Sequence, residues 1–187
     1  TRRSSDLMTF DVSVLEEFLP LTNGMTAVIA SDDEILNPIM LGDLIVKNKV
    51  DIMTTTPTYL SNMIDLPQLQ EAAAQIKVFD VGAEAFPPAL FDKIHAVNPD
   101  AYIMNGYGPT ETTISCTMKV ITDSRNITIG TPNGNVKVYI VDKENKKIWI
   151  LDYKTGGKDE EQLENYKRIL EGQFGNEYKV ETMFLYV

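Results

Sequence analysis

Short apolar runs alternate with amphipathic segments over the first hundred residues. Apolar residues recur at three- and four-residue spacing in the helical segments, which we predict at 10–22, 37–48, from Pro57, 66–76 and 87–95. Apolar runs bounded by Gly, Pro or polar residues predict strands at 25–30, 50–55, 77–81 and 101–104. The polar segment 31–34 is expected to be a loop. Strands and helices that alternate at short intervals indicate an α/β fold with a mainly parallel sheet flanked by helices.

The pattern changes after residue 113. Strands are predicted at 115–121, 135–142 and 147–152 with no helix between them, and Lys143–Lys146 has the composition of a hairpin turn. A helix at 158–171 and a strand at 178–187 follow. We therefore expect an antiparallel strand-helix-strand extension at the C-terminal end.

Composition narrows the class of protein. Of the 187 residues, 43% are hydrophobic and 24% charged, which is typical of a soluble globular chain. The net charge of −10 argues against a general nucleic-acid binder. A lone cysteine, Cys116, excludes an internal disulfide and is most simply a small strand residue. No long apolar stretch and no signal core are present, so we expect a cytoplasmic protein that does not contact a membrane.

The segment 105–113, Asn-Gly-Tyr-Gly-Pro-Thr-Glu-Thr-Thr, carries the clearest chemistry. It follows the strand at 101–104, and glycine and proline predict a loop at that strand end, where ligands bind in open α/β sheets. The loop offers backbone N–H groups, threonine hydroxyls, an aromatic ring and a carboxylate, a set that suits a nucleotide with its Mg²⁺. The alternative is a solvated turn capped by its own threonines.

This loop resembles the core signature of the AMP-forming adenylation domains, in particular those of nonribosomal peptide synthetases. Further segments resemble the same family in the same order: Phe10–Glu16, Thr55–Thr58, Val81–Ala85, Ile129–Pro132, and Asn135 with Val138–Asp142. The resemblance covers about residues 7–146. It implies an enzyme that joins ATP and an amino acid into an aminoacyl-AMP, and a carrier-protein domain as partner in the parent enzyme.

The resemblance also implies roles for individual residues. Tyr107 would stack on adenine, Thr110 would contact the α-phosphate, and Glu111 would hold Mg²⁺. Gly82 and Ala83 would border the adenosine. Hydroxyl and backbone donors stabilise charge that develops at phosphorus, and Mg²⁺ neutralises pyrophosphate, so the implied roles of ATP/AMP and Mg²⁺ agree with the chemistry of the loop.

A substrate pocket follows from the same resemblance. Asp11 would receive the α-ammonium group of the amino acid, and the alternative is that it caps the helix that follows it. The side-chain pocket would be lined by Val12, Leu15, Thr54, Phe79, Val81, Gly106, Ile114 and Ser115. Most of these are apolar, so we expect a mainly uncharged amino acid. For Val81 and Ile114 a place in the plain hydrophobic core is the alternative.

Parts of the family's site are not found in this sequence. The glycine- and Ser/Thr-rich phosphate loop is not present, nor are the later ribose-binding aspartate, the arginine and the mobile lysine found after residue 146. Because this catalysis depends on positioning and charge neutralisation, we expect no useful aminoacyl-AMP formation by this chain alone.

Residues 148–187 resemble a different family, the PD-(D/E)XK nucleases. Asp152 and Lys154 would flank a metal-bound water there, with Asp152 as metal ligand, and Gln162 and Tyr166 share one face of the following helix. A second metal-binding acid is not found, so at most weak cleavage of DNA is expected. Two alternatives stay open: Tyr153–Gly156 also resembles the adenylation family's Tyr-Lys/Arg-Thr-Gly-Asp segment, and Asp152 with Lys154 could be an exposed ion pair.

We therefore predict two parts, an adenylation core fragment at 1–142 and a nuclease-like tail at 143–187. Charge supports the division, since residues 1–142 hold 9 Lys and Arg against 18 Asp and Glu, whereas residues 143–187 hold 8 against 9. Such a chain would be a chimera, engineered or natural. The competing functions are a metal-dependent DNA nuclease and a catalytically silent scaffold or binding domain. Exposed sheet edges make self-association possible.

Overall fold

Three parallel strands and one antiparallel strand form the sheet of the N-terminal unit in this computed structural model, which describes residues 12–154 and 160–186. The chain divides into two units, Thr1–Gly130 and Thr131–Val187. In the first unit the strands lie in the order β1 (Ile52–Thr55), β2 (Val78–Gly82), β3 (Tyr102–Tyr107) and β4 (Thr117–Ile121). β1, β2 and β3 are parallel, and β4 is antiparallel to β3. The predicted α/β class is confirmed.

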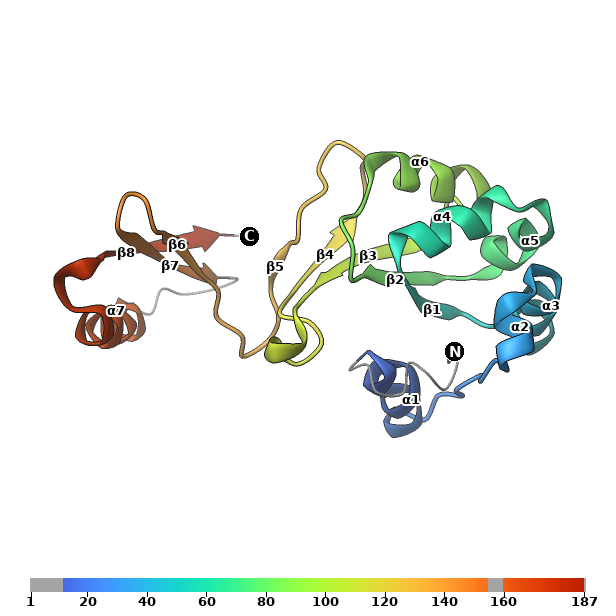
Figure 1. The fold of residues 1–187 in the computed structure, drawn as a ribbon, viewed down its shortest axis with the longest axis horizontal. Helices are drawn as coiled ribbons and strands as arrows, with labels where there is room; N and C mark the ends of the chain where they lie inside the picture. Colours follow the sequence, from blue (N-terminus) through green and yellow to red (C-terminus); the bar gives the residue numbers. More distant parts are fainter. Residues whose placement is uncertain (1–11, 155–159, 187) are drawn as a thin grey trace. The chain divides into compact units, whose positions relative to one another are not determined.

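Six α-helices belong to the described part of the first unit: α1 (Ser13–Thr22), α2 (Asp32–Leu36), α3 (Pro38–Asn48), α4 (Pro57–Asp65), α5 (Pro67–Gln75) and α6 (Pro88–Val97). Four of them begin with proline, whose fixed φ and missing N–H suit the first helical turn. Figure 1 shows α4, α5 and α6 together on one side of the sheet and α1 on the other. This arrangement leaves the sheet with one face covered by helices and a second face toward α1.

The core lies between the sheet and α4, α5 and α6. Phe79, Val81 and Ile103 project from the middle strands, and they pack in one cluster with Leu60 and Leu90 from the helices. Burying such side chains contributes about 1.5–3 kcal/mol each relative to leaving them exposed. The cluster therefore fixes which face of β2 and β3 points inward, and with it the face that is free to bind a ligand.

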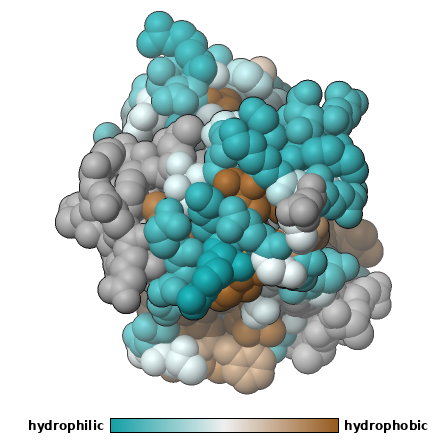
Figure 2. All heavy atoms as spheres, turned by 90° about the vertical axis from the view of Figure 1, so that its left-hand side faces the viewer, coloured by the Kyte–Doolittle hydropathy of each residue, from teal (hydrophilic) through white to brown (hydrophobic). Residues whose placement is uncertain are grey.

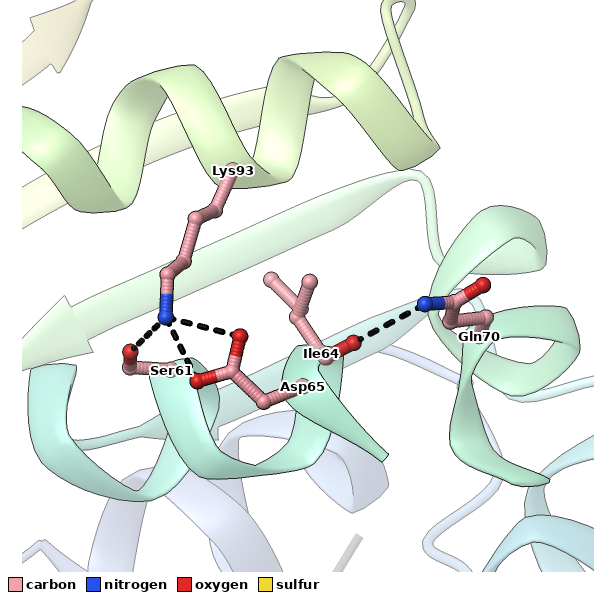
Figure 3. Close-up of polar contacts among 5 residues, drawn as sticks. All are labelled: Ser61, Ile64, Asp65, Gln70 and Lys93. Carbon is pink, nitrogen blue, oxygen red and sulfur yellow. Dashed lines mark hydrogen bonds and ion pairs between the residues drawn. The ribbon is translucent and has the colours of Figure 1, made fainter. Parts of the chain in front are cut away.

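A polar clamp joins α6 to α4 at the surface. The Lys93 amine donates a hydrogen bond to Ser61 Oγ at 2.9 Å and pairs with Asp65, with Nζ 2.6 Å from Oδ2 (Figure 3). On the neighbouring α5, Gln70 donates to the Ile64 carbonyl oxygen at 3.3 Å. The exposed ion pair is worth up to about 1 kcal/mol, so it adds to the packing of α4 on α6 without replacing it.

Two local predictions in this unit are wrong. Residues 25–30 form no regular strand, and only Ile29 makes an isolated bridge. The segment 31–34, expected to be a loop, opens α2 instead. Ser31 and Glu34 form a capping box, in which each side chain accepts a hydrogen bond from the other residue's backbone N–H. The Ser-x-x-Glu spacing is a helix-start signal, and it would have predicted a helix at this position.

The second unit is built around a hairpin. After the short β5 (Thr131–Pro132), β6 (Tyr139–Asp142) pairs antiparallel with β7 (Lys147–Lys154), as predicted. The chain then runs through α7 (Glu160–Phe174) and a short 3-10 turn (Gly175–Glu177) to β8 (Lys179–Tyr186). β8 pairs in parallel with β7, so the strand-helix-strand segment is a parallel crossover next to an antiparallel hairpin.

A small hydrophobic cluster holds this unit together. It consists of Ile148, Ile150, Leu163 and Val180, with Tyr166, Leu170 and Tyr178 packed against it.

The surface shown in Figure 2 is largely hydrophilic, with hydrophobic atoms in separate small areas. Among the helices of the described residues, none combines the length and the apolar character that crossing a membrane requires.

Candidate functional site

A pocket of about 320 Å³ opens at the carboxyl ends of the parallel strands. This is the edge where α/β sheets bind ligands, and the volume is within the range of small-molecule sites. Five elements and their flanking turns supply the walls: the start of α1, the ends of β1 and β2, β3 with the loop that follows it, and the start of β4. The lining residues are Val12, Ser13, Leu15, Glu16, Thr54, Thr55, Thr56, Asp80, Gly82, Ala83, Gly106, Gly108, Pro109, Thr110, Ile114, Ser115 and Met118.

The structure brings most of the sequence-predicted site residues of the first unit together. Nine of the seventeen lining residues were expected at the adenosine or amino-acid site from the sequence alone: Val12, Leu15, Thr54, Gly82, Ala83, Gly106, Thr110, Ile114 and Ser115. They come from segments far apart in the sequence. Ile114, for which a core position was the alternative, is half-buried and lines the pocket.

Phe79 and Val81 do not line the pocket, which corrects their predicted place. Both have no exposed surface and belong to the core beneath α4, α5 and α6. Successive side chains of a strand point to opposite faces, so the pocket residues of β2 are Asp80 and Gly82. The expectation of a mainly uncharged substrate came from a mostly apolar set of eight residues that included Phe79 and Val81, whereas β2 contributes the carboxylate of Asp80 to the pocket.

Asp80 is half-buried in the pocket, and burial raises the pKa of its carboxyl group above the ordinary value. In the register of the parallel strands it lies beside Thr54 of β1 and Met104 of β3. No hydrogen bond or ion pair joins Asp80 to another residue in the part of the chain that the structure describes. An unpaired carboxylate in low dielectric is unfavourable unless a ligand compensates it.

Glycines leave room around this carboxylate. A Cβ on Gly106 would lie 3.6 Å from Asp80 Oδ1, so the carboxylate passes close over the backbone of β3. A Cβ on Gly82 would lie 3.0 Å from the Gly106 carbonyl oxygen, which is tighter than ordinary contact. The close approach of the two strand ends is therefore favoured by the missing side chain of Gly82, whereas a Cβ on Gly106 would make an ordinary contact.

The loop after β3 folds back on itself tightly. A Cβ on Gly108 would lie 2.5 Å from Ser115 Cα, and the Cys116 N–H donates to the Tyr107 carbonyl oxygen at 2.9 Å. Thr113 and Ile114 both have positive φ, 62° and 73°, which is a strained conformation for β-branched residues. Such strain is typical of binding loops whose surroundings fix the backbone.

The three residues of this loop that were predicted to bind the nucleotide differ from one another in their position relative to the pocket. Thr110 lines the pocket, at the start of a short turn that ends at Thr112. Tyr107 is 49% exposed and Glu111 is exposed, and neither lines the pocket. Both are within the same loop as Thr110, so their roles toward adenine and Mg²⁺ stay predictions.

The turn after β2 is held by a carboxylate. Ala83 has a φ of 66°, and the next residue, Glu84, accepts hydrogen bonds from the Thr58 N–H at 3.1 Å and the Thr58 hydroxyl at 2.6 Å. Thr58 is in the first turn of α4, where a negative charge is favourable. Glu84 thus ties the Gly82–Ala83 wall of the pocket to α4, a positioning contact that the sequence interpretation missed.

Other predicted site residues lie outside what the structure describes. Asp11 precedes the described residues. Asp152 and Lys154 belong to β7 and Gln162 to α7, but their side chains are not among those described. Tyr166 packs against the small cluster of the second unit, and the Lys137 amine donates a hydrogen bond to its hydroxyl. Within the described residues there is no group of three or more His, Cys, Asp or Glu that could hold a metal ion.

Comparison with known proteins decides the family. Residues 7–156 match the family described as AMP-binding enzyme. The chain belongs to this family. Its relatives include tyrocidine synthase 3 of Brevibacillus parabrevis, with 32% identity over 135 residues, which are 72% of this chain and 2% of that protein. A D-alanine–D-alanyl carrier protein ligase of Bacillus velezensis is 29% identical over 145 residues, 74% of this chain and 29% of the ligase.

A solved relative supports the fold of this AMP-binding chain. A four-domain nonribosomal peptide synthetase, bound to AMP and glycine, matches with a TM-score of 0.61 and 26% identity, over 72% of this chain and 10% of the synthetase. The resemblance to adenylation domains of the nonribosomal peptide synthetase type is thereby confirmed. The chain spans less than a third of the length of each of these relatives.

The family match also bears on the predicted tail. It runs through Gly156 and so includes the β6–β7 hairpin and the segment Tyr153–Gly156. Of the two interpretations of that segment, the match favours the adenylation one. The AMP-binding match also continues beyond residue 142, where the sequence predicted a boundary between families.

Proposed function

We propose that this member of the AMP-binding family binds ATP with Mg²⁺ and an amino acid at the pocket, as the amino-acid-activating part of a peptide synthetase. The observation that carries the proposal is the convergence of α1, β1, β2 and the loop after β3 on one pocket. In this proposal the Thr110 hydroxyl and the backbone of its loop donate to phosphate oxygens, and Glu111 accompanies Mg²⁺.

The amino acid is proposed to lie along the apolar wall of the pocket. Val12 and Leu15 from α1, Gly106 from β3 and Ile114 from the loop form apolar surface there. Asp11 is proposed to pair with the α-ammonium group. The name of the Bacillus velezensis relative describes it as a ligase that acts on a carrier protein. By analogy, we propose that a carrier-protein domain accepts the activated amino acid.

Calorimetry with ATP–Mg²⁺ tests the nucleotide part. We expect saturable binding that Thr110→Val weakens by about tenfold, the loss expected when a charge-assisted hydrogen bond to phosphate is removed. Thr122→Val is the matched control, because Thr122 is exposed and does not line the pocket. Equal affinities in the two variants would remove Thr110 from the proposed site.

Binding without turnover is the outcome we expect from this chain. None of the residues that line the described pocket is Lys or Arg, and departure of pyrophosphate requires positive charge besides Mg²⁺. Amino-acid-dependent exchange of labelled pyrophosphate into ATP measures turnover directly. Robust exchange by the purified chain would contradict the expected inactivity and strengthen the assignment to amino-acid activation.

A second candidate, metal-dependent DNA cleavage, is favoured by one observation only. β7 and β8 are parallel and joined through α7, which fits the strand-helix-strand core expected of the nuclease-like tail. Incubation of linear DNA with the chain and Mg²⁺ tests it, with Asp152→Ala as the variant and Glu171→Ala, an exposed carboxylate of α7, as control. We expect at most weak cleavage, and strong cleavage lost only in Asp152→Ala would establish the nuclease.

A further inference from the structure

The charge of the pocket is one-sided. Two of its described lining residues are carboxylic acids, Glu16 from α1 and Asp80 from β2, and none is Lys, Arg or His. The remaining walls are apolar or carry hydroxyl groups. Of the two, Asp80 is the carboxylate for which no described residue supplies a compensating charge, and low-dielectric surroundings strengthen its field in the pocket.

Asp80 is the carboxylate of the pocket for which the described residues show no structural role. It interrupts an otherwise apolar strand, Val78-Phe79-Asp80-Val81, whose other side chains pack in the core or half-buried beside it. Its neighbours across the strands, Thr54 and Met104, carry no charge. A carboxylate that caps no helix and pairs with no described residue costs stability at this depth, and a ligand of opposite charge would offset that cost.

We infer that the pocket selects an amino acid whose side chain ends in a cation, an ammonium or guanidinium group that pairs with Asp80. This inference rests on the proposed amino-acid site and names its substrate class. The aliphatic stem of such a side chain would lie along the apolar walls formed by Val12, Leu15 and Ile114, while its head reaches β2.

Space at the strand ends agrees with this assignment. Asp80 Oδ1 lies 3.6 Å from where a Cβ of Gly106 would be, and Gly82 follows two residues after Asp80 on the same face. The absence of side chains at both glycines leaves the carboxylate accessible from the pocket. Asp80 is on β2, whereas Leu15 of the apolar wall belongs to α1.

Pairs of nearly isosteric amino acids test the charge of the side chain. Lysine and norleucine differ by the terminal ammonium, and arginine and citrulline differ in charge while both retain N–H donors. Binding to the full chain is followed by calorimetry and by NMR shifts of the Thr54, Gly82 and Gly106 amides. We expect lysine or arginine to bind about tenfold tighter than its neutral counterpart or more, as for a charge-assisted pair.

The variant Asp80→Asn keeps the shape of the side chain and removes its charge. We expect the preference for the basic member of each pair to fall to about twofold or less in Asp80→Asn, while the exposed Asp92→Asn, which changes the net charge equally, keeps it. Equal binding within both pairs, no detectable binding of either basic amino acid, or a preference that survives in Asp80→Asn would each overturn the inference.

A parallel titration with ATP–Mg²⁺ separates this inference from the proposed function. ATP binding together with no preference for a cation would overturn the substrate class and leave the nucleotide site standing. A cation preference that depends on Asp80, with no ATP binding, would support the pocket's selectivity and remove the nucleotide part of the proposal.

Discussion

Asp80 carries a measurable cost in stability because burial raises the pKa of its carboxyl group. The folded state then holds the proton to a higher pH than the unfolded chain does. The resulting destabilisation is absent well below the ordinary value of 3.8 and grows as the pH rises from there through the raised pKa. We predict that Asp80→Asn stabilises the first unit at neutral pH, and that the gain shrinks in acid. Urea unfolding at neutral and acidic pH measures it, and a loss of stability at neutral pH would contradict the prediction.

Gly108 tests the tight return of the binding loop. An added Cβ would lie 2.5 Å from Ser115 Cα and 2.8 Å from the Cys116 nitrogen, both backbone atoms that cannot rotate away. We predict that Gly108→Ala destabilises the first unit by about 1–3 kcal/mol, the usual cost of overpacking. Thermal unfolding measures the loss. Gly106→Ala is the control in the same unit, since its added Cβ would meet only Asp80 Oδ1, at an ordinary contact distance of 3.6 Å, and equal effects of the two changes would refute the steric argument.

At the residue scale, the sequence predicted the location of the site correctly. It assigned the wrong residues of β2 to the face of the strand that lines the pocket. The glycines, threonines and proline of 105–113 identify a ligand loop because their chemistry does not depend on tertiary contacts. For residues 77–81 the hydrophobic pattern predicted a strand without indicating which of its faces points inward. A shift by one residue exchanges the two faces, so Phe79 and Val81 were placed in the pocket that Asp80 occupies. Asp80 and Gly82 are two residues apart and neither is a typical core residue, so this spacing could have indicated the face of the strand that points away from the core.

Among the secondary-structure elements, α3 depends on a cap that can be tested. Asn37 Oδ1 accepts hydrogen bonds from the Ile39 N–H at 3.0 Å and the Met40 N–H at 3.4 Å. The helix then buries Leu41 and Ile45. We predict that Asn37→Ala destabilises the first unit by about 1 kcal/mol, whereas Asn37→Asp retains the stability because aspartate also accepts from these N–H groups. Denaturant midpoints compare the variants, and equal losses in both would show that the cap hydrogen bonds do not matter.

Helix starts were predictable where proline and a polar cap coincide. Asn37-Pro38 and Thr56-Pro57 each mark a helix within a residue of its observed start, because a proline restricts the backbone locally. Residues 25–30 have the composition of a strand, yet they form none. Strand formation depends on a partner strand as well as on composition, and within the described residues Ile29 makes a single bridge. Local signals therefore predicted helices better than they predicted pairing.

For the whole chain, the division into two units has energetic consequences. The first unit holds a large cluster that includes Phe79, Leu60 and Ile94, whereas the buried cluster among the residues of the second unit whose side chains are described consists of Ile148, Ile150, Leu163 and Val180. Small cores bury proportionally less apolar surface and are less stable. The sequence predicted a division by family near residue 142, and the structure divides by packing after Gly130, so packing and family resemblance mark different features of the chain.

Separate hydrophobic clusters predict separate unfolding transitions, with the second unit melting first. Ile148 is 1% exposed in the small cluster, and Ile94 is 1% exposed in the large one. Ile148→Ala removes about 2–5 kcal/mol of packing and should lower only the first transition, whereas Ile94→Ala should lower only the second. Differential scanning calorimetry resolves the two, and near-ultraviolet circular dichroism of the single tryptophan, Trp149 in β7, reports the second unit alone. One cooperative transition that both variants shift equally would show that the units unfold together, because a two-state chain distributes every loss over the whole molecule.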